Sequence, residues 1–257
     1  NPYYLASPHR EIALRNVSFS YDGIDTVLKD VDVAIEFGER VAIVGPNGGG
    51  KSTLINLICR FYDPTEGTVE LDNVPLTELA VKDLRRRIAI VTQQTELFNE
   101  TILYNIRYGR WDATDEEIEE AARKARAHDF IAEFPDGYKT KVGPNGFRLS
   151  GGQRQRIVIA RALAAEPQLL ICDEAVAALD VSVQAQVLNL LVKLKDERGL
   201  ALLFISHDLG VVRYLCDHTV VMDQGRVVES GVSDDLWSTP NHEVTRRLQA
   251  AGGGSIA

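Results

Sequence analysis

Strand-length apolar runs alternate with segments of helical periodicity along this chain. Apolar runs near residues 87–92, 169–172 and 201–206 are each about the length of one buried strand. In other segments apolar side chains recur every three or four positions, which indicates helices. Strands are predicted at about 11–19, 27–36, 40–44, 67–72, 87–92, 169–172, 201–206, 219–222 and 226–229, and helices at 51–60, 114–134, 150–165 and 181–198.

This alternation predicts an α/β fold with a mostly parallel sheet, because strands that are apolar throughout suit a sheet covered on both faces. The early strands predict an antiparallel β lobe, the middle section predicts a helical lobe, and residues 223–225 predict a hairpin turn. Residues 114–134 are predicted as one helix. Thr114 suits its N-cap, Glu116 and Glu117 favour its N-terminal end, and alanines fill its body.

Composition narrows the class of protein. The 257 residues include 28 basic and 37 acidic side chains, and the net charge of −9 argues against a large nucleic-acid-binding face. The longest uninterrupted apolar stretch, residues 200–205, is far shorter than the ~20 residues of a membrane-spanning helix. No signal-peptide pattern is present. Cys59, Cys172 and Cys216 have neither metal-ligand spacing nor a disulfide pattern, which indicates a reducing compartment.

The segment Gly-Pro-Asn-Gly-Gly-Gly-Lys-Ser at residues 45–52 is the most specific chemical motif. It joins a predicted strand to a predicted helix, so its backbone N–H groups and the helix N-terminus suit a phosphate. We expect Lys51 to reach the β- and γ-phosphates and Ser52 to bind Mg²⁺. The alternative is a plain glycine-rich turn. The predicted nucleotide-binding residues here are Gly45, Pro46, Asn47, Gly48, Gly49, Gly50, Lys51, Ser52 and Thr53.

Two further segments carry candidate chemistry. The apolar run 169–172 ends on Asp173, expected to hold Mg²⁺ through water, and Glu174, expected to polarise an attacking water as general base. The alternative is a pair of surface acids. Leu-Ser-Gly-Gly-Gln at residues 149–153 begins a predicted helix, and its N–H groups suit either an anion or a simple N-cap.

The Leu-Ser-Gly-Gly-Gln segment, followed by Arg-Gln-Arg, an apolar strand and Asp-Glu, resembles the signature of ABC transporter ATPase domains. The resemblance covers about residues 11–235, with every motif in family order. It implies a P-loop NTPase core in which Tyr21 stacks on adenine and Gln93, in the Q-loop, senses Mg²⁺ or the lytic water. It also implies a D-loop aspartate at Asp180 and a switch histidine at His207 that contacts the γ-phosphate. The alternatives are a core tyrosine and a structural histidine.

The resemblance further implies partners. In that family the signature of one cassette closes over ATP held by the phosphate loop of another. We therefore expect ATP and Mg²⁺ as cofactors, a second ABC cassette, and the transmembrane domain of a transporter, with no nucleic acid. The expected location is peripheral, on the cytoplasmic face of a membrane, with the isolated domain soluble. The signature residues are Ser150, Gly151, Gly152 and Gln153.

Four regions are expected from the motif order. They are residues 1–92 (antiparallel β lobe and first part of the P-loop core), 93–155 (Q-loop and helical lobe carrying the signature), 156–232 (second part of the core) and 233–257 (C-terminal helix and flexible tail).

The two halves of the chain resemble different branches of the family. Residues 16–148 resemble exporter cassettes and residues 157–245 resemble peptide-importer ATPases, with the signature as a natural crossover point. Our main hypothesis is an ATP-hydrolysing motor domain of an exporter-type transporter. One alternative is a recombined or engineered chimera that binds nucleotide without a transport partner, with ordinary divergence as the simpler account of the mixture. Another is a soluble ABC-type ATPase acting on DNA, ribosomes or cluster assembly.

Overall fold

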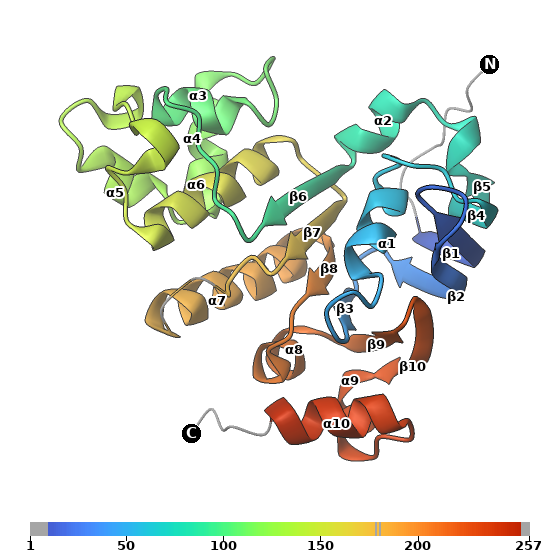
Figure 1. The fold of residues 1–257 in the computed structure, drawn as a ribbon. Helices are drawn as coiled ribbons and strands as arrows, with labels where there is room; N and C mark the ends of the chain where they lie inside the picture. Colours follow the sequence, from blue (N-terminus) through green and yellow to red (C-terminus); the bar gives the residue numbers. More distant parts are fainter. Residues whose placement is uncertain (1–9, 178, 180, 253–257) are drawn as a thin grey trace.

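The computed structural model describes residues 10–177, 179 and 181–252 as two sheets and a helical lobe (Figure 1). Within this part of the chain, no helix is both long and apolar enough to cross a membrane. The elements are β1 (Glu11–Ser20), β2 (Thr26–Glu36), β3 (Arg40–Val44), α1 (Lys51–Ile58), β4 (Glu66–Leu71), β5 (Val74–Pro75), η1 (Leu76–Glu78), α2 (Val81–Arg86), β6 (Ile88–Thr92), α3 (Ile102–Arg107), α4 (Asp115–Lys124), α5 (His128–Ala132), η2 (Gly137–Lys139), η3 (Pro144–Gly146), α6 (Gly151–Ala164), β7 (Leu169–Asp173), α7 (Val181–Arg198), β8 (Ala201–Ile205), α8 (Leu209–Leu215), β9 (His218–Asp223), β10 (Arg226–Val232), α9 (Ser233–Ser238) and α10 (Glu243–Gly252).

The six-stranded sheet has the order β10-β9-β3-β8-β7-β6, and β3, β6, β7, β8 and β9 run parallel within it. β10 is antiparallel to β9, which confirms the predicted hairpin. On neighbouring strands Thr92 lies beside Asp173, and Asp173 lies beside Ile205. The segments that follow β6, β7 and β8 therefore leave the sheet at one edge.

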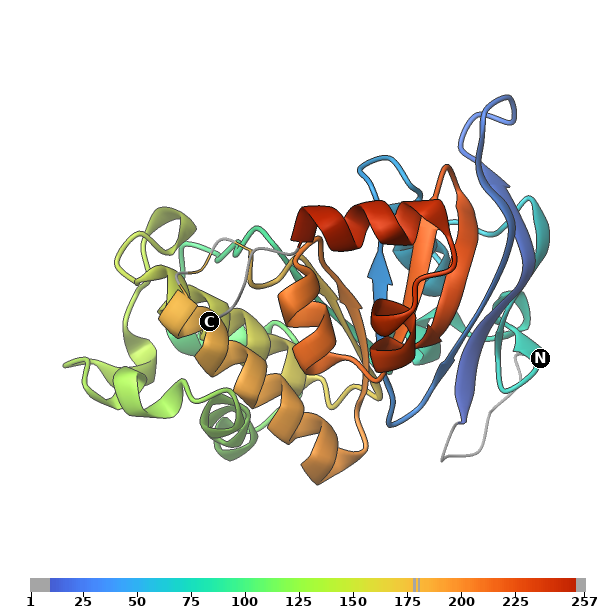
Figure 2. The ribbon, with the colours of Figure 1, turned by 90° about the horizontal axis from the view of Figure 1, so that it is seen from below.

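Both faces of this sheet are covered, as predicted. Side chains alternate along each strand, so Ala42 and Val44 of β3 face one core cluster and Val41 and Ile43 face the other. The first cluster includes the buried side of α6, α7 and α8. The second lies between the sheet, α1 and the antiparallel sheet, whose order is β2-β1-β4-β5. Figure 2 shows the antiparallel strands at one end of the molecule and the helical lobe at the other.

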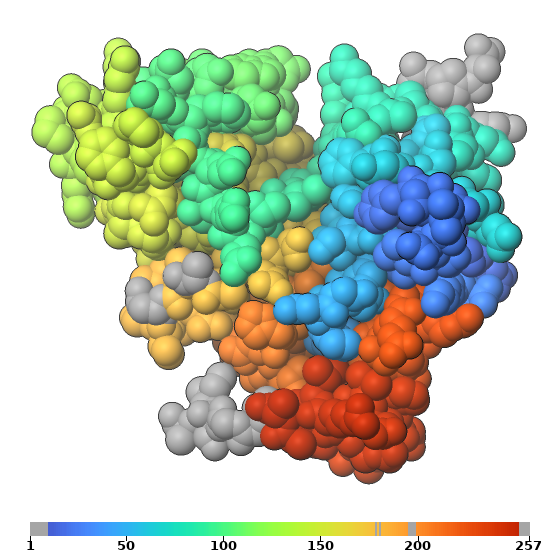
Figure 3. Space-filling model, in the orientation of Figure 1, coloured from blue at the N-terminus to red at the C-terminus, as the bar shows by residue number. Residues whose placement is uncertain are grey.

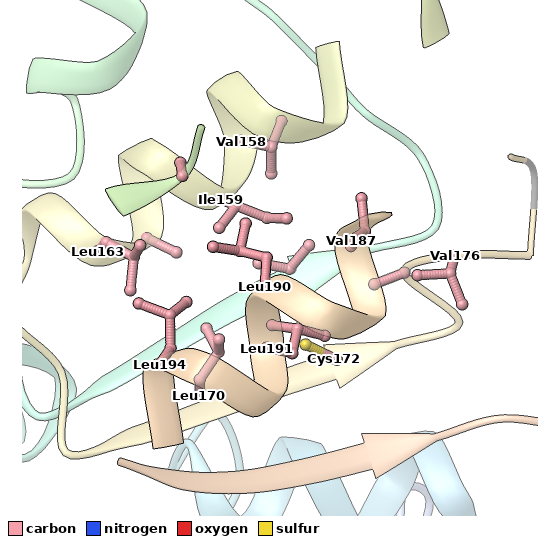
Figure 4. Close-up of a cluster of buried hydrophobic side chains, with 14 of the residues drawn as sticks. Val158, Ile159, Leu163, Leu170, Cys172, Val176, Val187, Leu190, Leu191 and Leu194 are labelled. Atoms are coloured by element: carbon pink, nitrogen blue, oxygen red, sulfur yellow. The ribbon is translucent and has the colours of Figure 1, made fainter. Parts of the chain in front are cut away.

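Helix α6 is held to the core by aliphatic contacts. Figure 4 shows its side chains interdigitating with those of α7 over β7 and the segment that follows it. Contacts of this kind are strong but non-directional. The buried residues labelled there are Val158, Ile159, Leu163, Leu170, Cys172, Val176, Val187, Leu190, Leu191 and Leu194.

The prediction of one helix over residues 114–134 is wrong, because the chain forms α4 and α5 with a break between them. Arg126 adopts a left-handed conformation with φ of 51°. Its N–H donates to the carbonyl of Arg123, and the N–H of Ala127 donates to that of Ala122. This pair of bonds closes the end of a helix in the way that glycine usually allows. No glycine marks the stop, so the sequence did not reveal it.

The start of α4 agrees with the prediction. Thr114 accepts a hydrogen bond from the N–H of Glu117, whose side chain accepts one from the N–H of Thr114. Several short helices were not predicted, and among them α2, α3 and α8 span only 6, 6 and 7 residues. Elements of this length show too few turns for a clear helical period.

Glu229 attaches the C-terminal helix to β10. Its carboxylate accepts hydrogen bonds from the N–H of Asn241 at 2.9 Å, the N–H of His242 at 3.0 Å and the hydroxyl of Thr245. Desolvation alone would raise the pKa of Glu229, but these hydrogen bonds outweigh it and the pKa is lowered. The carboxylate therefore places a negative charge at the N-terminal end of α10, where the helix dipole favours it.

Candidate functional site

The loop between β3 and α1 has a backbone that requires glycine. Gly45, Gly48 and Gly50 have φ values of 149°, 76° and 99°. A Cβ atom at Gly45 would overlap the carbonyl oxygen of Met222, so a larger residue does not fit. Gly50 is the N-cap of α1 and provides no side-chain acceptor for the first N–H groups of the helix. Those donors remain directed toward the space where an anion would bind.

Lys51 lies over this loop. Its ammonium donates hydrogen bonds to the carbonyl oxygens of Gly45 and Pro46, both at 2.9 Å. Burial lowers the pKa of Lys51, while the negative charges of Glu174 and Asp173 oppose that shift. The ammonium is thus within electrostatic reach of both acids.

The other residues of this loop are exposed in its first part and buried where it joins α1. Pro46, Asn47 and Gly48 are exposed, Gly49 and Gly50 are buried, and Ser52 at the start of α1 is exposed while Thr53 is buried. The hydroxyl of Ser52 is therefore accessible to a bound ligand.

The predicted acids lie at the carboxyl end of β7. Asp173 is the last residue of the strand, and Glu174 turns away from it with φ of 51° while its N–H donates to the carbonyl of Ile205 at 3.0 Å. Burial raises the pKa of Asp173, repulsion from Glu174 raises it further, and Lys51 opposes both effects. A cation that binds Asp173 would relieve this cost.

His207 follows β8 and meets Glu174 across the sheet edge. Its Nδ1 lies 3.4 Å from Oε1 of Glu174, and the imidazole side chain is 67% exposed. The ring is therefore open to a ligand that approaches the acids.

Gln93 follows β6 at the same sheet edge. Together with Gln94 and Asp173 it lines a cavity of about 470 Å³. The structure therefore brings Gln93, Asp173, Glu174 and His207 to the edge from which the segments after β6, β7 and β8 emerge.

Tyr21 follows β1 and lies beside the first turn of α1. Its hydroxyl donates to Oγ1 of Thr53 at 3.2 Å and accepts from Nδ2 of Asn56 at 3.1 Å. Its ring packs edge-on against Phe19 and Tyr62 and is 49% exposed, so Tyr21 is not a core residue. The exposed ring lies next to the phosphate loop.

The Leu-Ser-Gly-Gly-Gln segment forms the N-terminus of α6. The N–H of Gln153 donates to Oγ of Ser150 at 3.2 Å, and Oε1 of Gln153 accepts from the N–H of Ser150 at 2.9 Å. Gly151 and Gly152 form the first turn, and Gly152 is buried against Val183. α6 belongs to the first core cluster and α1 to the second, so the strands of the sheet separate this segment from the phosphate loop (Figure 1).

The structure adds two residues that the sequence analysis missed. Arg161 of α6 donates to the carbonyl oxygens of Asn105 at 2.9 Å and Glu96 at 3.2 Å, and it lines the same cavity as Gln93 and Asp173. Asn105 is fully buried. The sequence did contain a signal for Arg161, because it is the lone charged residue in the apolar run Ile-Val-Ile-Ala-Arg-Ala-Leu-Ala at residues 157–164.

A larger hollow lies on another part of the surface. A cavity of about 770 Å³ opens between α2 and residues 109–112, and Figure 3 shows the hollow between the helical lobe and α2. Its cationic lining residues are Lys82, Arg85, Arg86 and Arg110.

Among the described residues, no group of three or more His, Cys, Asp and Glu side chains forms a metal cage. The residues predicted to hold Mg²⁺ offer oxygen donors, namely the hydroxyl of Ser52, the amide of Gln93 and the carboxylate of Asp173. This set suits Mg²⁺, which keeps several waters and binds one or two carboxylates together with substrate phosphates. Asp180, the predicted D-loop aspartate, lies outside the described residues.

Comparison with known proteins gives consistent matches. The family described as ABC transporter matches residues 28–177. An ATP-dependent lipid A-core flippase of Syntrophus aciditrophicus is 47% identical over 88% of this chain and 37% of its own length. The mitochondrial iron-sulfur clusters transporter atm1 of Aspergillus fumigatus is 41% identical over 93% of this chain and 34% of its own length. The structure also matches that of a bacterial Atm1-family ABC exporter with ATP bound, with a TM-score of 0.90 and 37% sequence identity. The match covers 100% of this chain and 44% of the exporter chain.

These matches extend over both halves of the chain. Single proteins named as a flippase or a transporter align with 88–93% of it, so the comparisons do not support the recombined-cassette hypothesis. The chain spans a little over a third of the length of these two curated relatives.

Proposed function

The chain belongs to the ABC transporter family, and from that premise we propose that it is the ATP-binding and ATP-hydrolysing motor domain of an exporter-type transporter. One arrangement carries the proposal: the glycine-dependent loop before Lys51 follows β3, and Asp173, Glu174 and His207 lie at the carboxyl ends of β7 and β8 in the same parallel sheet. A phosphate-binding loop opposite a potential base is the arrangement that γ-phosphate hydrolysis requires.

In the proposed bound state, the N–H groups of residues 47–53 surround the phosphates of ATP, and Gly45 and Pro46 form the start of the loop. Lys51 exchanges its loop carbonyls for phosphate oxygens, an exchange supported by charge-assisted hydrogen bonds of about 1.5–3 kcal/mol each. The exposed ring of Tyr21 stacks on adenine. Ser52, Gln93 and Asp173 would hold Mg²⁺, which would neutralise charge on the phosphate oxygens.

Hydrolysis is proposed to use the two residues that meet at the sheet edge. The carboxylate of Glu174 accepts a hydrogen bond from water, orients it toward the γ-phosphorus and takes its proton as the bond to phosphorus forms. The imidazole of His207, which lies 3.4 Å from that carboxylate, donates to a γ-phosphate oxygen. The bond from phosphorus to the β–γ bridging oxygen breaks, and ADP and phosphate leave.

The signature is proposed to act on a second cassette. Ser150, Gly151, Gly152 and Gln153 offer N–H donors and a helix N-terminus but no lysine, so they suit the completion of a site held by another chain. Asp180 would contribute from the D-loop of the same interface. Two cassettes would then bury two ATP molecules.

The remaining length of the relatives implies a further partner. We propose that the Q-loop and helical lobe, residues 93–155, meet a transporter's transmembrane domain at the cytoplasmic face of a membrane. The cation-lined hollow beside α2 is adjacent to this lobe and offers a place for such contact. The regions 1–92 and 156–232 would form the P-loop core, and 233–257 a C-terminal extension.

The test compares Glu174→Gln with Glu116→Gln, an exposed glutamate on α4. We expect Glu174→Gln to lower ATP turnover by about 10²–10⁴-fold, the usual contribution of a general base, and Glu116→Gln to leave it unchanged. Equal turnover in the two variants would refute the proposed role of Glu174.

The mass in solution tests the proposed partner. With its base removed, Glu174→Gln should be a dimer with ATP and a monomer with ADP, because bound ATP keeps the two cassettes together. A monomer with both nucleotides, with nucleotide binding shown separately, would contradict closure between two copies of this chain.

A further inference from the structure

Arg161 joins the signature helix to the segment that leaves the Q-loop. It lies eleven residues after Ser150, which is about 16 Å along the helix at ~1.5 Å per residue. Its Nε donates to the carbonyl of Asn105 at 2.9 Å, its Nη2 to Oδ1 of Asn105 at 2.9 Å, and its Nη1 to the carbonyl of Glu96 at 3.2 Å. The guanidinium also lies over the rings of Phe98 and Tyr108.

Asn105, which Arg161 contacts, also binds the backbone of the segment 98–101 that follows the Q-loop. Its Oδ1 accepts from the N–H of Phe98 at 2.9 Å, and its Nδ2 donates to the carbonyls of Phe98 and Thr101 at 3.0 Å each. Because Asn105 is fully buried, each of these bonds replaces water that the amide has lost. Arg161 and Asn105 therefore hold Glu96 and Phe98 against α6.

The other end of the Q-loop is fixed separately. Thr92 is the last residue of β6 and pairs with Asp173 of β7. Between Thr92, fixed to the sheet, and Glu96, fixed to α6, lie only Gln93, Gln94 and Thr95. The stretch from Thr92 to Glu96 is four residues long and reaches at most about 14 Å, so only a short length of chain joins Gln93 to the attached Glu96.

Among the other contacts of α6 with the core, Arg156 bonds to Gln186 of α7 and Gly152 packs on Val183, and both are contacts with α7 rather than with the Q-loop exit. The aliphatic cluster of Figure 4 is non-directional and tolerates small sliding of packed helices. The three hydrogen bonds of the Arg161 fork are directional and specify one register. Arg161 is thus a group on α6 that sets the position of the helix relative to the Q-loop exit.

We propose that Arg161 is a positioning residue that couples the position of Gln93 at the Mg²⁺ site to the position of the signature at the other end of α6. When Gln93 shifts toward Asp173, Glu96 follows, and Arg161 carries the shift to α6 and its N-terminus. This inference rests on the proposed ATPase function, since the coupled positions matter only if both segments act on ATP.

The kinetic test compares Arg161→Met and Arg161→Lys with Arg123→Met, which removes an exposed arginine that pairs with Glu119 and Glu120 on α4. We expect Arg161→Met to lower kcat at least tenfold, since a misplacement of ~1 Å can cost about 10²-fold, while the KM for ATP changes less than about threefold. The kcat of Arg161→Lys should lie between those of the wild type and Arg161→Met, because lysine keeps the charge but lacks the planar guanidinium. Arg123→Met should match the wild type. A rise in KM with kcat kept would overturn the inference.

Hydrogen exchange tests the attachment without relying on turnover. In the nucleotide-free protein, residues 96–98 and 150–156 should exchange faster in both Arg161 variants than in Arg123→Met, while residues 11–36 should not change. If Arg161→Met does not fold, Arg161→Lys provides the comparison. Equal exchange in the Arg161 and Arg123 variants overturns the inference. A wild-type chain that shows the attachment but no ATP turnover would instead refute the proposed function.

Discussion

Substitution of Gly152 by alanine tests whether packing holds the signature in place. Gly152 is in the first turn of α6 and faces α7. A Cβ atom at this position would lie 2.6 Å from Cγ1 and 3.3 Å from Cγ2 of Val183. At Gly151 the nearest atoms to an added Cβ are 3.9 and 4.0 Å away, which is ordinary contact. The two adjacent glycines therefore differ in the space around them.

The magnitude follows from these distances. Carbon atoms pack at about 3.5–4.0 Å, so Gly152→Ala must displace α6 or Val183 by about 1 Å. Overpacking of this kind costs about 1–3 kcal/mol. Gly151→Ala should instead stabilise the helix by up to about 1 kcal/mol, because alanine is the better helix former. A shift of ~1 Å in the signature should also reduce ATP turnover by about 10²-fold.

The assay pairs thermal unfolding with ATP turnover. Gly152→Ala should lower the unfolding midpoint by several degrees, whereas Gly151→Ala should not. Val183→Ala removes both clashing atoms and leaves the Cβ of Val183 at 3.6 Å, so the double variant Gly152→Ala/Val183→Ala should recover most of the stability and turnover. The Val183→Ala variant alone is the control for the lost contacts.

Two results would refute this reasoning. The first is a Gly152→Ala variant as stable as Gly151→Ala, which would mean that the contact with Val183 is not rigid. The second is a double variant that regains stability but not turnover. Gly152 would then act through its contact with nucleotide, and packing would not explain the loss.

Two further predictions concern adenine and pH. Tyr21→Ala should weaken ATP binding about tenfold in a binding titration, since the stacking of one base on an aromatic ring is worth about 1–3 kcal/mol. Tyr21→Phe loses only the hydrogen bonds with Thr53 and Asn56 and should bind ATP nearly as tightly as the wild type. Equal weakening in the two variants would exclude stacking. The folded-state pKa of Glu229 is lowered, so its contribution to stability is present above the unfolded pKa and is lost as pH falls through the folded pKa. Glu229→Gln should therefore lower the free energy of unfolding at pH 7 by under about 1 kcal/mol, because the carboxylate is only partly buried. The difference should vanish in acid, and a difference independent of pH would contradict this.

Local patterns in the chain were enough to predict most elements that bear the site. The loop between β3 and α1 was predictable because its glycines, Lys51 and Ser52 lie within eight consecutive residues, and a backbone conformation depends mainly on neighbouring residues. The strand before Asp173 and the helix after Ser150 were predictable for the same reason. The break at Arg126 was not, because a left-handed helix end without glycine has no local signal.

Contacts between distant segments were decided only in the folded molecule. Thr92 and Asp173 become neighbours through strand order, and Tyr21 reaches Thr53 because the antiparallel sheet packs beside α1. Arg161 and Glu96 are 65 residues apart in sequence, yet one side chain joins them. Such pairs form only after the apolar faces of whole elements have packed, since burial of those faces offsets the entropy of closing the long loops between them. Motif chemistry is therefore encoded locally, whereas the coupling between motifs depends on tertiary packing.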